Sequence, residues 1–214
     1  RLLQEKSSRL DEIVSHRFST LLTNQAGCLD KNPRLNHKQA ISKNSNTTKD
    51  TPLHGLFLNT YYPSFLDSHY EKHPELSSSQ YSIQKQSLQH ECFGDSDYYS
   101  EGLIKAGWDA EDLVVNCVPL QQAWARENNF HGEGLSVVVE QIRQARPDVV
   151  YIQDLNICTK EFLTLIRPHT SLIVGQIASP IPQVAYLADI DIIFSSFPHF
   201  VDRFRQAGIT SFYQ

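Results

Sequence analysis

The chain has 214 residues, of which 40% are hydrophobic and 20% charged, so it can bury a sizeable core. Nine Gly and ten Pro exclude a collagen-like or Pro/Gly-dominated fibrous chain. No run approaches the roughly 18 apolar residues of a membrane-spanning helix. The net charge of −5 is uneven, since residues 1–54 carry nine Lys and Arg against five Asp and Glu, and the remainder carries ten against nineteen. An acidic body disfavours nucleic acid as the main partner, because neutralising phosphates requires clustered cations.

The sequence contains no Met and begins with Arg1, which leads us to expect a segment of a longer protein. Residues 1–22 place Leu, Ile, Val and Phe at helical spacing between charged residues, which predicts an amphipathic helix. Such a helix would be the end of a coiled coil and an oligomerisation handle. Residues 23–53 are polar, with SKNSNTTKD at their centre, and predict a flexible linker. The sequence therefore predicts that a separate domain spans 54–214.

This domain alternates apolar runs with helical patterns. The runs that predict strands are 54–60, 112–117, 148–154, 171–177, 190–196 and 209–214. The patterns that predict helices are 79–92, 95–106, 119–129, 133–145, 159–166 and 197–208. Because the runs are continuous in Val, Ile and Leu, they are typical of parallel strands buried on both faces. Strand, helix and strand repeated five times predicts an α/β fold: a doubly wound, mostly parallel, Rossmann-like sheet of about six strands with helices on both faces.

Cysteine and histidine spacing gives no sign of a metal site. The four cysteines lie tens of residues apart without a C-x-x-C pair: Cys28, Cys92, Cys117 and Cys158. Three of them lie in or beside apolar segments, so structural zinc is not expected and a reducing, cytoplasmic setting is favoured. Six histidines are scattered over loops and helices without a ligand spacing that we recognise: His54, His69, His73, His90, His131 and His169.

Ligands of open parallel sheets bind at the carboxyl ends of the strands, near the topological switch point. Amides, hydroxyls and aromatic rings dominate these ends and suit a neutral, hydroxylated ligand. The alternative is that such residues form turns and caps, as Ser195 or Ser196 would before a helix. The predicted binding residues are Asn59, Thr60, Tyr61, Tyr62, Asn116, Gln153, Gln176, Ser179, Ser195 and Ser196.

Two ionisable residues at the strand ends are the candidate catalytic groups. Asp154 closes the run VVYIQD, where it could accept a proton or hold a ligand hydroxyl. His199 lies in the first turn of a predicted helix, whose dipole favours the neutral imidazole, and could act as a base or hydrogen-bond donor. The alternatives are that Asp154 caps the following helix and that His199 is a structural or surface residue.

A long excursion separates the first two predicted strands. Residues 61–100 hold six tyrosines: Tyr61, Tyr62, Tyr70, Tyr81, Tyr98 and Tyr99. Such an insertion lies over the ligand end of the sheet, where it shapes an acceptor pocket. It could also be a helical cap that packs its aromatic rings into the domain, and both can be true.

Several nucleotide and hydrolase motifs are missing. NTYYPSF follows the first strand in place of G-x-G-x-x-G, which disfavours dehydrogenases and common methyltransferases. The sequence has neither a P-loop nor a G-x-S-x-G nucleophile elbow. Close approach of this chain's backbone to a pyrophosphate is therefore not expected.

Five segments together carry a family resemblance: FLNTYYPSFLDSHY, HECFGDSDYYSEGLIKAGWDAEDLVVNC, DVVYIQDL, LIVGQIASP and FSSFPHFVDRFRQAGI. They resemble the N-terminal half of a GT-B glycosyltransferase of the spore-maturation-protein type, similar to the family 4 retaining enzymes. The resemblance implies two Rossmann-like domains facing a cleft. The second domain, absent here, would hold the nucleotide-sugar donor, and this one the acceptor. The resemblance implies no metal and no cofactor beyond the nucleotide-sugar co-substrate. The cleft floor would comprise Asn59–Tyr62, Asp154, Gln176 and the turn Ser195–His199.

Two functions follow as hypotheses. The first is the acceptor-binding half of a glycosyltransferase of the hexosyltransferase type, which passes a sugar from a nucleotide-sugar donor to a hydroxyl acceptor. This half alone would be inactive. The alternative is a non-catalytic Rossmann-like sensor or interaction module. The sequence that follows Gln214 in the parent gene would separate them, because only the enzyme requires a second Rossmann-like half.

Overall fold

The computed structural model describes residues 51–183 and 185–214. The helix expected over 1–22 and nearly all of the linker expected over 23–53 lie outside these residues. Leu53–Gln214 forms one compact unit, and the fold is described for that unit. No helix in the described ranges has the length and apolar character needed to cross a bilayer.

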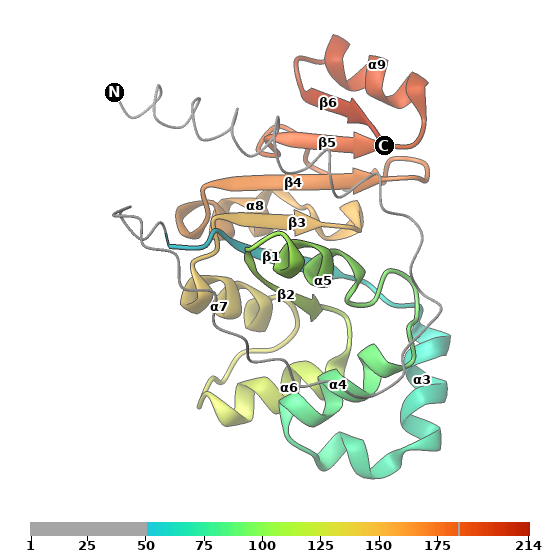
Figure 1. Ribbon diagram of the computed structural model, residues 1–214, viewed down its shortest axis with the longest axis vertical. Coiled ribbons are helices and arrows are strands. Elements are labelled where there is room, and N and C mark those ends of the chain that lie inside the picture. Colours follow the sequence, from blue (N-terminus) through green and yellow to red (C-terminus); the bar gives the residue numbers. More distant parts are fainter. Residues whose placement is uncertain (1–50, 184) are drawn as a thin grey trace, which may run out of the picture. The chain divides into compact units, whose positions relative to one another are not determined.

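Six parallel strands form one sheet in the order β2-β1-β3-β4-β5-β6 (Figure 1). The strands are β1 His54–Asn59, β2 Asp109–Val114, β3 Val149–Ile152, β4 Leu172–Ile177, β5 Ile192–Ser195 and β6 Thr210–Tyr213. Every adjacent pair runs parallel, and β1, β3, β4 and β5 are almost wholly buried. The predicted Rossmann-like, doubly wound α/β class is confirmed.

The sheet has its topological switch point at β1. The chain passes from β1 to β2 on one side and then returns to β3 on the other side. In this register Leu58 lies opposite both Leu113 of β2 and Ile152 of β3. The connection that leaves β1 and the connection that leaves β3 run in opposite directions, so a ligand crevice is expected beyond the carboxyl ends of these two strands.

Seven helices and three 3-10 turns join the strands over the described part of the chain. The helices are α3 Pro63–Lys72, α4 Tyr81–His90, α5 Tyr98–Lys105, α6 Val118–Glu127, α7 Leu135–Ala145, α8 Lys160–Ile166 and α9 Pro198–Gln206. The 3-10 turns are η2 Pro74–Ser78, η3 Leu155–Ile157 and η4 Arg167–His169. Pro occupies the first turn of α3, α6 and α9, where its missing N–H costs no helical hydrogen bond. Thr159 starts α8 by accepting a hydrogen bond from the backbone of Phe162.

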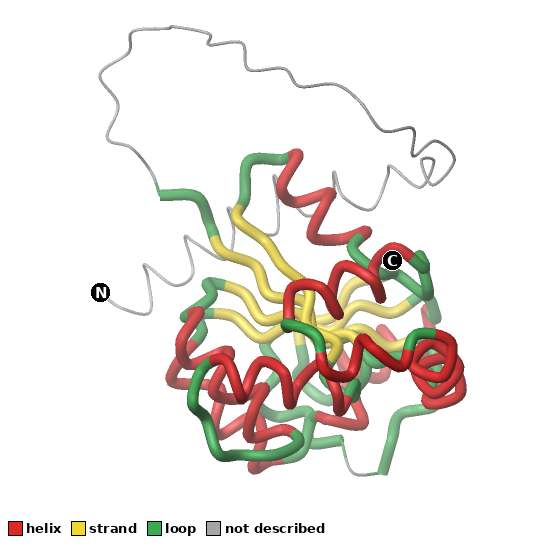
Figure 2. Tube along the Cα trace, turned by 90° about the horizontal axis from the view of Figure 1, so that it is seen from below, coloured by secondary structure: helices red, strands yellow, loops and turns green. Residues whose placement is uncertain are grey.

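Helices cover both faces of the sheet (Figure 2). One face packs against α7, α8 and α9 in a single apolar cluster that includes Leu58, Val138, Ile142, Ile152, Leu163, Ile173, Ile193 and Phe204. The other face packs against α5 over β1 and β2. Gly55 permits this approach, because a Cβ there would lie 3.2 Å from Cδ1 of Leu103.

Three details differ from the sequence prediction. Strand β2 is Asp109–Val114 rather than 112–117, because pairing with β1 starts at Asp109 and the chain turns away after Val115. The connection from β4 to β5 contains no helix in its described residues, so only four of the five crossovers are helical. Pro180 and Pro182 interrupt it, and each removes a backbone donor. The polar segment Pro63–Lys72 forms α3, which the periodicity did not predict.

Core packing beneath the sheet can be tested on one helix. Leu163 is fully buried, whereas Leu165 on the same helix is 49% exposed. We expect Leu163→Ala to lower the free energy of unfolding by about 2–5 kcal/mol, because it leaves a cavity against the sheet. Leu165→Ala, the matched control, should change it by no more than about 0.5 kcal/mol. Urea unfolding of both variants measures this, and equal effects would contradict the packing described.

Candidate functional site

The predicted site residues all lie at or just beyond the carboxyl ends of the strands, as the sheet requires. Their side chains nevertheless have different structural roles. Some hold the loop that follows β1, some hold the turns that follow β5 and β3, and others are exposed at the edge of the sheet.

Two asparagines fix the loop after β1. Nδ2 of the buried Asn59 donates to the backbone oxygen of Ser96 at 2.9 Å and to Oδ1 of Asp112 at 3.2 Å. The Asn116 side chain pairs with the backbone of Tyr61, accepting from its N–H at 3.0 Å and donating to its oxygen at 2.7 Å. These hydrogen bonds fix the conformation of the loop that follows β1, and the two side-chain amides are not free to turn toward a ligand.

Tyr61 belongs to the core. Its ring is buried and lies edge-on to Phe65 and Phe93, at centroid distances of 5.6 Å and 5.3 Å. Burial raises the pKa of Tyr61 to about 12. The phenol is therefore neutral at physiological pH, and its ring supports the loop rather than stacking on a ligand.

Two of the predicted residues hold the turns that follow β5 and β3. Oγ of the buried Ser195 accepts a hydrogen bond from the backbone of Phe197 at 3.1 Å, just before α9. Oδ1 of Asp154 accepts from the backbone and side chain of Asn156, at 2.9 Å and 2.7 Å, and starts η3. The capping interpretation thus applies to Asp154, whereas α9 starts at Phe197 without a side-chain cap, so Ser195 holds a turn and does not cap the helix. Oδ2 of Asp154 has no donor among the described residues and remains open to a ligand.

Four predicted residues are exposed at the edge: Tyr62, Ser179, Ser196 and His199. Tyr62 is 72% exposed, and its ring lies edge-on to Phe93. The imidazole of His199 contacts the rings of Phe197 and Phe200, with centroids 5.6 Å and 4.6 Å away. An exposed tyrosine and a ring-supported histidine are therefore available at this edge of the sheet.

Gln176 is held in one orientation by a hydrogen-bonded group that we call the tyrosine–glutamine network: Tyr99, Tyr151, Gln176 and Gln214. Oε1 of Gln176 accepts from the hydroxyl of Tyr151 at 2.6 Å and from that of Tyr99 at 3.4 Å. Gln214 donates to the Tyr99 hydroxyl at 3.0 Å. Because the carbonyl end of Gln176 faces the tyrosines, its amide NH₂ is left to donate elsewhere.

A stack of aromatic rings supports the tyrosine–glutamine network. The rings of Phe57, Tyr99 and Tyr151 lie 5.2–5.7 Å apart, centroid to centroid. Tyr99 comes from α5 and Tyr151 from β3, so the stack fastens the long excursion to the centre of the sheet. The sequence places Tyr99 in the excursion and assigns no role to Tyr151. Tyr151 lies two residues before Gln153, which follows β3, and this period of two is the signal that could have revealed it.

Polar groups at the switch point are incompletely paired within the described part of the chain. Oδ1 of Asn59 and Oγ1 of Thr60 are buried without a hydrogen-bond partner. Nearby, Gln153 donates to Asp95 at 2.9 Å. Buried polar atoms without partners are rare in folded proteins, so these two oxygens can accept a hydrogen bond from water or a ligand.

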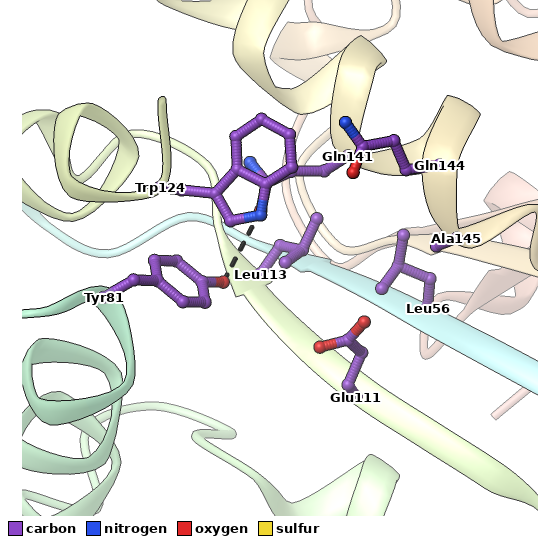
Figure 3. A pocket seen from close by; sticks show the side chains of 8 residues that line it. All are labelled: Leu56, Tyr81, Glu111, Leu113, Trp124, Gln141, Gln144 and Ala145. Atoms are coloured by element: carbon purple, nitrogen blue, oxygen red, sulfur yellow. Dashed lines mark hydrogen bonds between the residues drawn. The ribbon is translucent and has the colours of Figure 1, made fainter. Parts of the chain in front are cut away.

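A hollow of about 310 Å³ opens between α4, α6, α7 and β2 (Figure 3). It is lined by Leu56, Tyr81, Glu111, Leu113, Trp124, Gln141, Gln144 and Ala145. The hydroxyl of Tyr81 lies 3.5 Å from Oε1 of Gln141, and Glu111 pairs with Lys85 at 3.1 Å. Leu56 is three residues before the end of β1, so this hollow lies away from the switch point. Nothing in the sequence pattern predicts this hollow.

No protein-family model, curated protein or solved structure matches this chain. The function must therefore be inferred from the residues of the site and from its position in the fold.

A buried carboxylate lies behind the crevice. Asp112 accepts hydrogen bonds from the Ser100 hydroxyl and from Asn59. Burial raises the pKa of Asp112 from 3.8 to about 6, although these hydrogen bonds oppose the shift. The folded protein therefore keeps this proton at pH values where the unfolded chain has lost it.

The shift predicts a specific pH dependence of stability. As the pH rises from about 3 to about 7, the free energy of unfolding should fall by about 3 kcal/mol, because Asp112 ionises at lower pH in the unfolded chain than in the folded protein. Asp112→Asn should remove this decline, because the amide resembles the protonated acid. Urea unfolding at a series of pH values measures it. The control is Asp109→Asn, an exposed aspartate on the same strand, which should keep the decline. A decline unchanged in Asp112→Asn would refute the assignment.

Proposed function

We propose that this chain is the acceptor-binding lobe of a glycosyltransferase that passes a sugar from a nucleotide-sugar donor to a hydroxyl acceptor. The observation that carries the proposal is the fixed amide of Gln176 at the carboxyl edge of the sheet. Two tyrosine hydroxyls orient it, so its NH₂ group is ready to donate to a ligand oxygen. An amide held in this way loses little entropy on binding.

The chemistry of the edge supports a neutral, hydroxylated ligand. Its available groups are the Gln176 amide, the Ser179 and Ser196 hydroxyls, the Tyr62 ring and one carboxylate oxygen of Asp154. Amides and hydroxyls both donate and accept, which matches the hydroxyl groups of a sugar. An exposed aromatic ring covers the apolar face of a sugar ring. Among the described residues that follow the strands, no cluster of Lys or Arg stands ready for an anionic ligand.

Catalysis in this proposal depends mainly on positioning. The acceptor oxygen bonds to the anomeric carbon while the bond to the diphosphate breaks, and the hydroxyl proton passes to a base. Asp154 or His199 would contact the acceptor and take up this proton. The proposal assigns stabilisation of the departing diphosphate to a second lobe that binds the donor. It also includes a reducing, cytoplasmic setting, in keeping with the free thiols of Cys92, Cys117 and Cys158.

The activity is tested with the product of the complete reading frame. Incubated with a panel of nucleotide sugars and simple acceptors, it should release nucleoside diphosphate from at least one donor. Failure to turn over or bind any donor would overturn the proposal. Ligand binding by this lobe without any sugar transfer would instead support the non-catalytic sensor module.

Acceptor binding by the edge predicts an effect of Tyr62. Tyr62→Ala should weaken the binding of a saccharide ligand about fivefold, because it removes a contact worth about 1 kcal/mol. Stability should not change, since the side chain is 72% exposed. Titration calorimetry or ligand-detected NMR measures the affinity. The control is Tyr213→Ala at the end of β6, which is 62% exposed and four strands away from β1. Equal effects of both variants would contradict a site at the switch point.

A further inference from the structure

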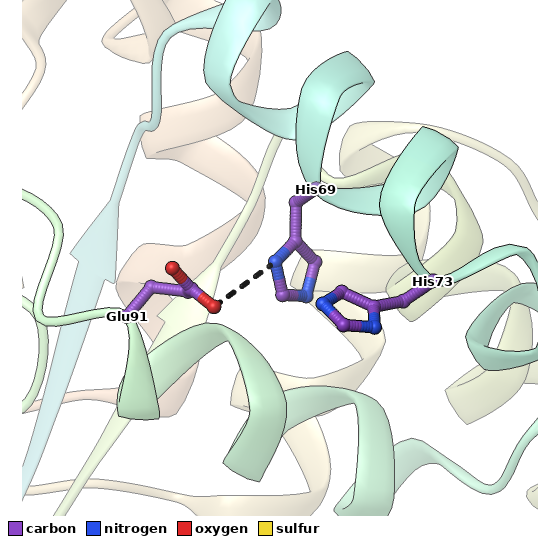
Figure 4. A group of neighbouring side chains, drawn as sticks. All are labelled: His69, His73 and Glu91. Carbon is purple, nitrogen blue, oxygen red and sulfur yellow. Dashed lines mark ion pairs between the residues drawn. The ribbon is translucent and has the colours of Figure 1, made fainter.

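A group of metal-ligating side chains lies outside the crevice, where α3 and α4 end (Figure 4). His69 is on the last turn of α3, His73 follows that helix, and Glu91 follows α4. One ligand atom from each of the three lies within 4.8 Å of the others. Tetrahedral zinc ligands, about 2.0–2.2 Å from the ion, lie about 3.3–3.6 Å apart, so shifts of about 1 Å would close the group around a metal.

His69 is already fixed in a suitable orientation. Its side chain is 3% exposed, and Nδ1 faces Oε1 of Glu91 at 3.8 Å. Nε2 lies 3.2 Å from Oγ of Ser87. A histidine that binds a metal through one ring nitrogen donates a hydrogen bond from the other, which Ser87 is placed to accept. The stacked ring of Phe65, at 6.0 Å, further restricts the imidazole.

His73 and Glu91 leave the group open to solvent. Their side chains are 45% and 44% exposed, so an ion could reach the site and keep a water ligand. Glu75 lies 3.9 Å from Nδ1 of His73 and would orient that ring as an outer partner.

Electrostatics also favours a cation here. Both α3 and α4 end at the group, and the C-terminus of a helix carries partial negative charge. The carboxylates of Glu91 and Glu75 add to this potential. Two imidazoles and a carboxylate form a ligand set that suits zinc and related transition metals. His73 ends α3 four residues after His69, and its N–H donates to the backbone oxygen of His69 at 3.1 Å.

We propose that His69, His73 and Glu91 bind one transition-metal ion of the zinc type, with water in the remaining position. The ion ties the end of α3 to the end of α4. This site is independent of the acceptor crevice and of the proposed sugar transfer.

Titration of the 214-residue chain with Zn²⁺, followed by calorimetry and thermal unfolding, tests the proposal. The wild-type chain should bind Zn²⁺ and unfold at a higher temperature with it. His73→Ala and Glu91→Gln each remove one exposed ligand and should leave the fold intact. Each should weaken binding by more than the roughly tenfold cost of losing an outer partner, and should abolish the thermal shift. Co²⁺ should give the visible absorption of a site with nitrogen and oxygen ligands.

Two neighbours serve as matched controls. His90→Ala removes an exposed imidazole beside Glu91, and Cys92→Ser removes an exposed thiol. Both should bind Zn²⁺ as the wild type does. Absence of Zn²⁺ binding in the wild type, or equal binding by the ligand variants and the controls, would overturn the proposal.

Discussion

The pairing of β1 with both β2 and β3 is the constraint on which the rest of the structure depends. It places β1 between β2 and β3, so that the connections leaving β1 and β3 run in opposite directions, and a ligand crevice is expected at this point of the sheet. Leu58 lies opposite Leu113 and Ile152 in a strand that is covered on both faces, so β1 is apolar from Gly55 to Leu58. The first residues that can carry chemistry are those that follow, and this is why the polar groups gather at this edge.

Much of the polar chemistry at that edge supports the site rather than contacting a ligand. Asn59 and Asn116 hold the loop after β1, and Ser195 and Asp154 hold the turns that follow β5 and β3. Buried amides of this kind are stable only when paired, so their hydrogen bonds make the loop rigid. The groups left for a ligand, such as the Gln176 amide, are consequently held in place before binding.

The long excursion after β1 connects the two sites that we infer. Its residue Tyr99 orients Gln176 from the side of α5, while its residues His69 and Glu91 form the proposed metal group at the ends of α3 and α4. Phe65 stacks on both Phe93 and His69, so one aromatic layer lies between the crevice loop and that group. The excursion therefore shapes the ligand edge and packs its rings into the domain at the same time.

The sequence alone determined the fold class, because continuous runs such as DVVYI require burial on both faces and only a parallel sheet covered by helices provides it. It also predicted the ends of five strands to within two residues, whereas β2 ends at Val114 rather than at residue 117. Only the tertiary structure decided what those residues do, since Tyr99 and Gln214 meet across 115 positions and Asn59 finds its partners Ser96 and Asp112 far along the chain. The spacing of four between His69 and His73 could be seen in the sequence, but the third ligand, Glu91, could not. Periodicity records which side of an element is buried, whereas a hydrogen bond or a ligand set depends on which distant segments are brought together.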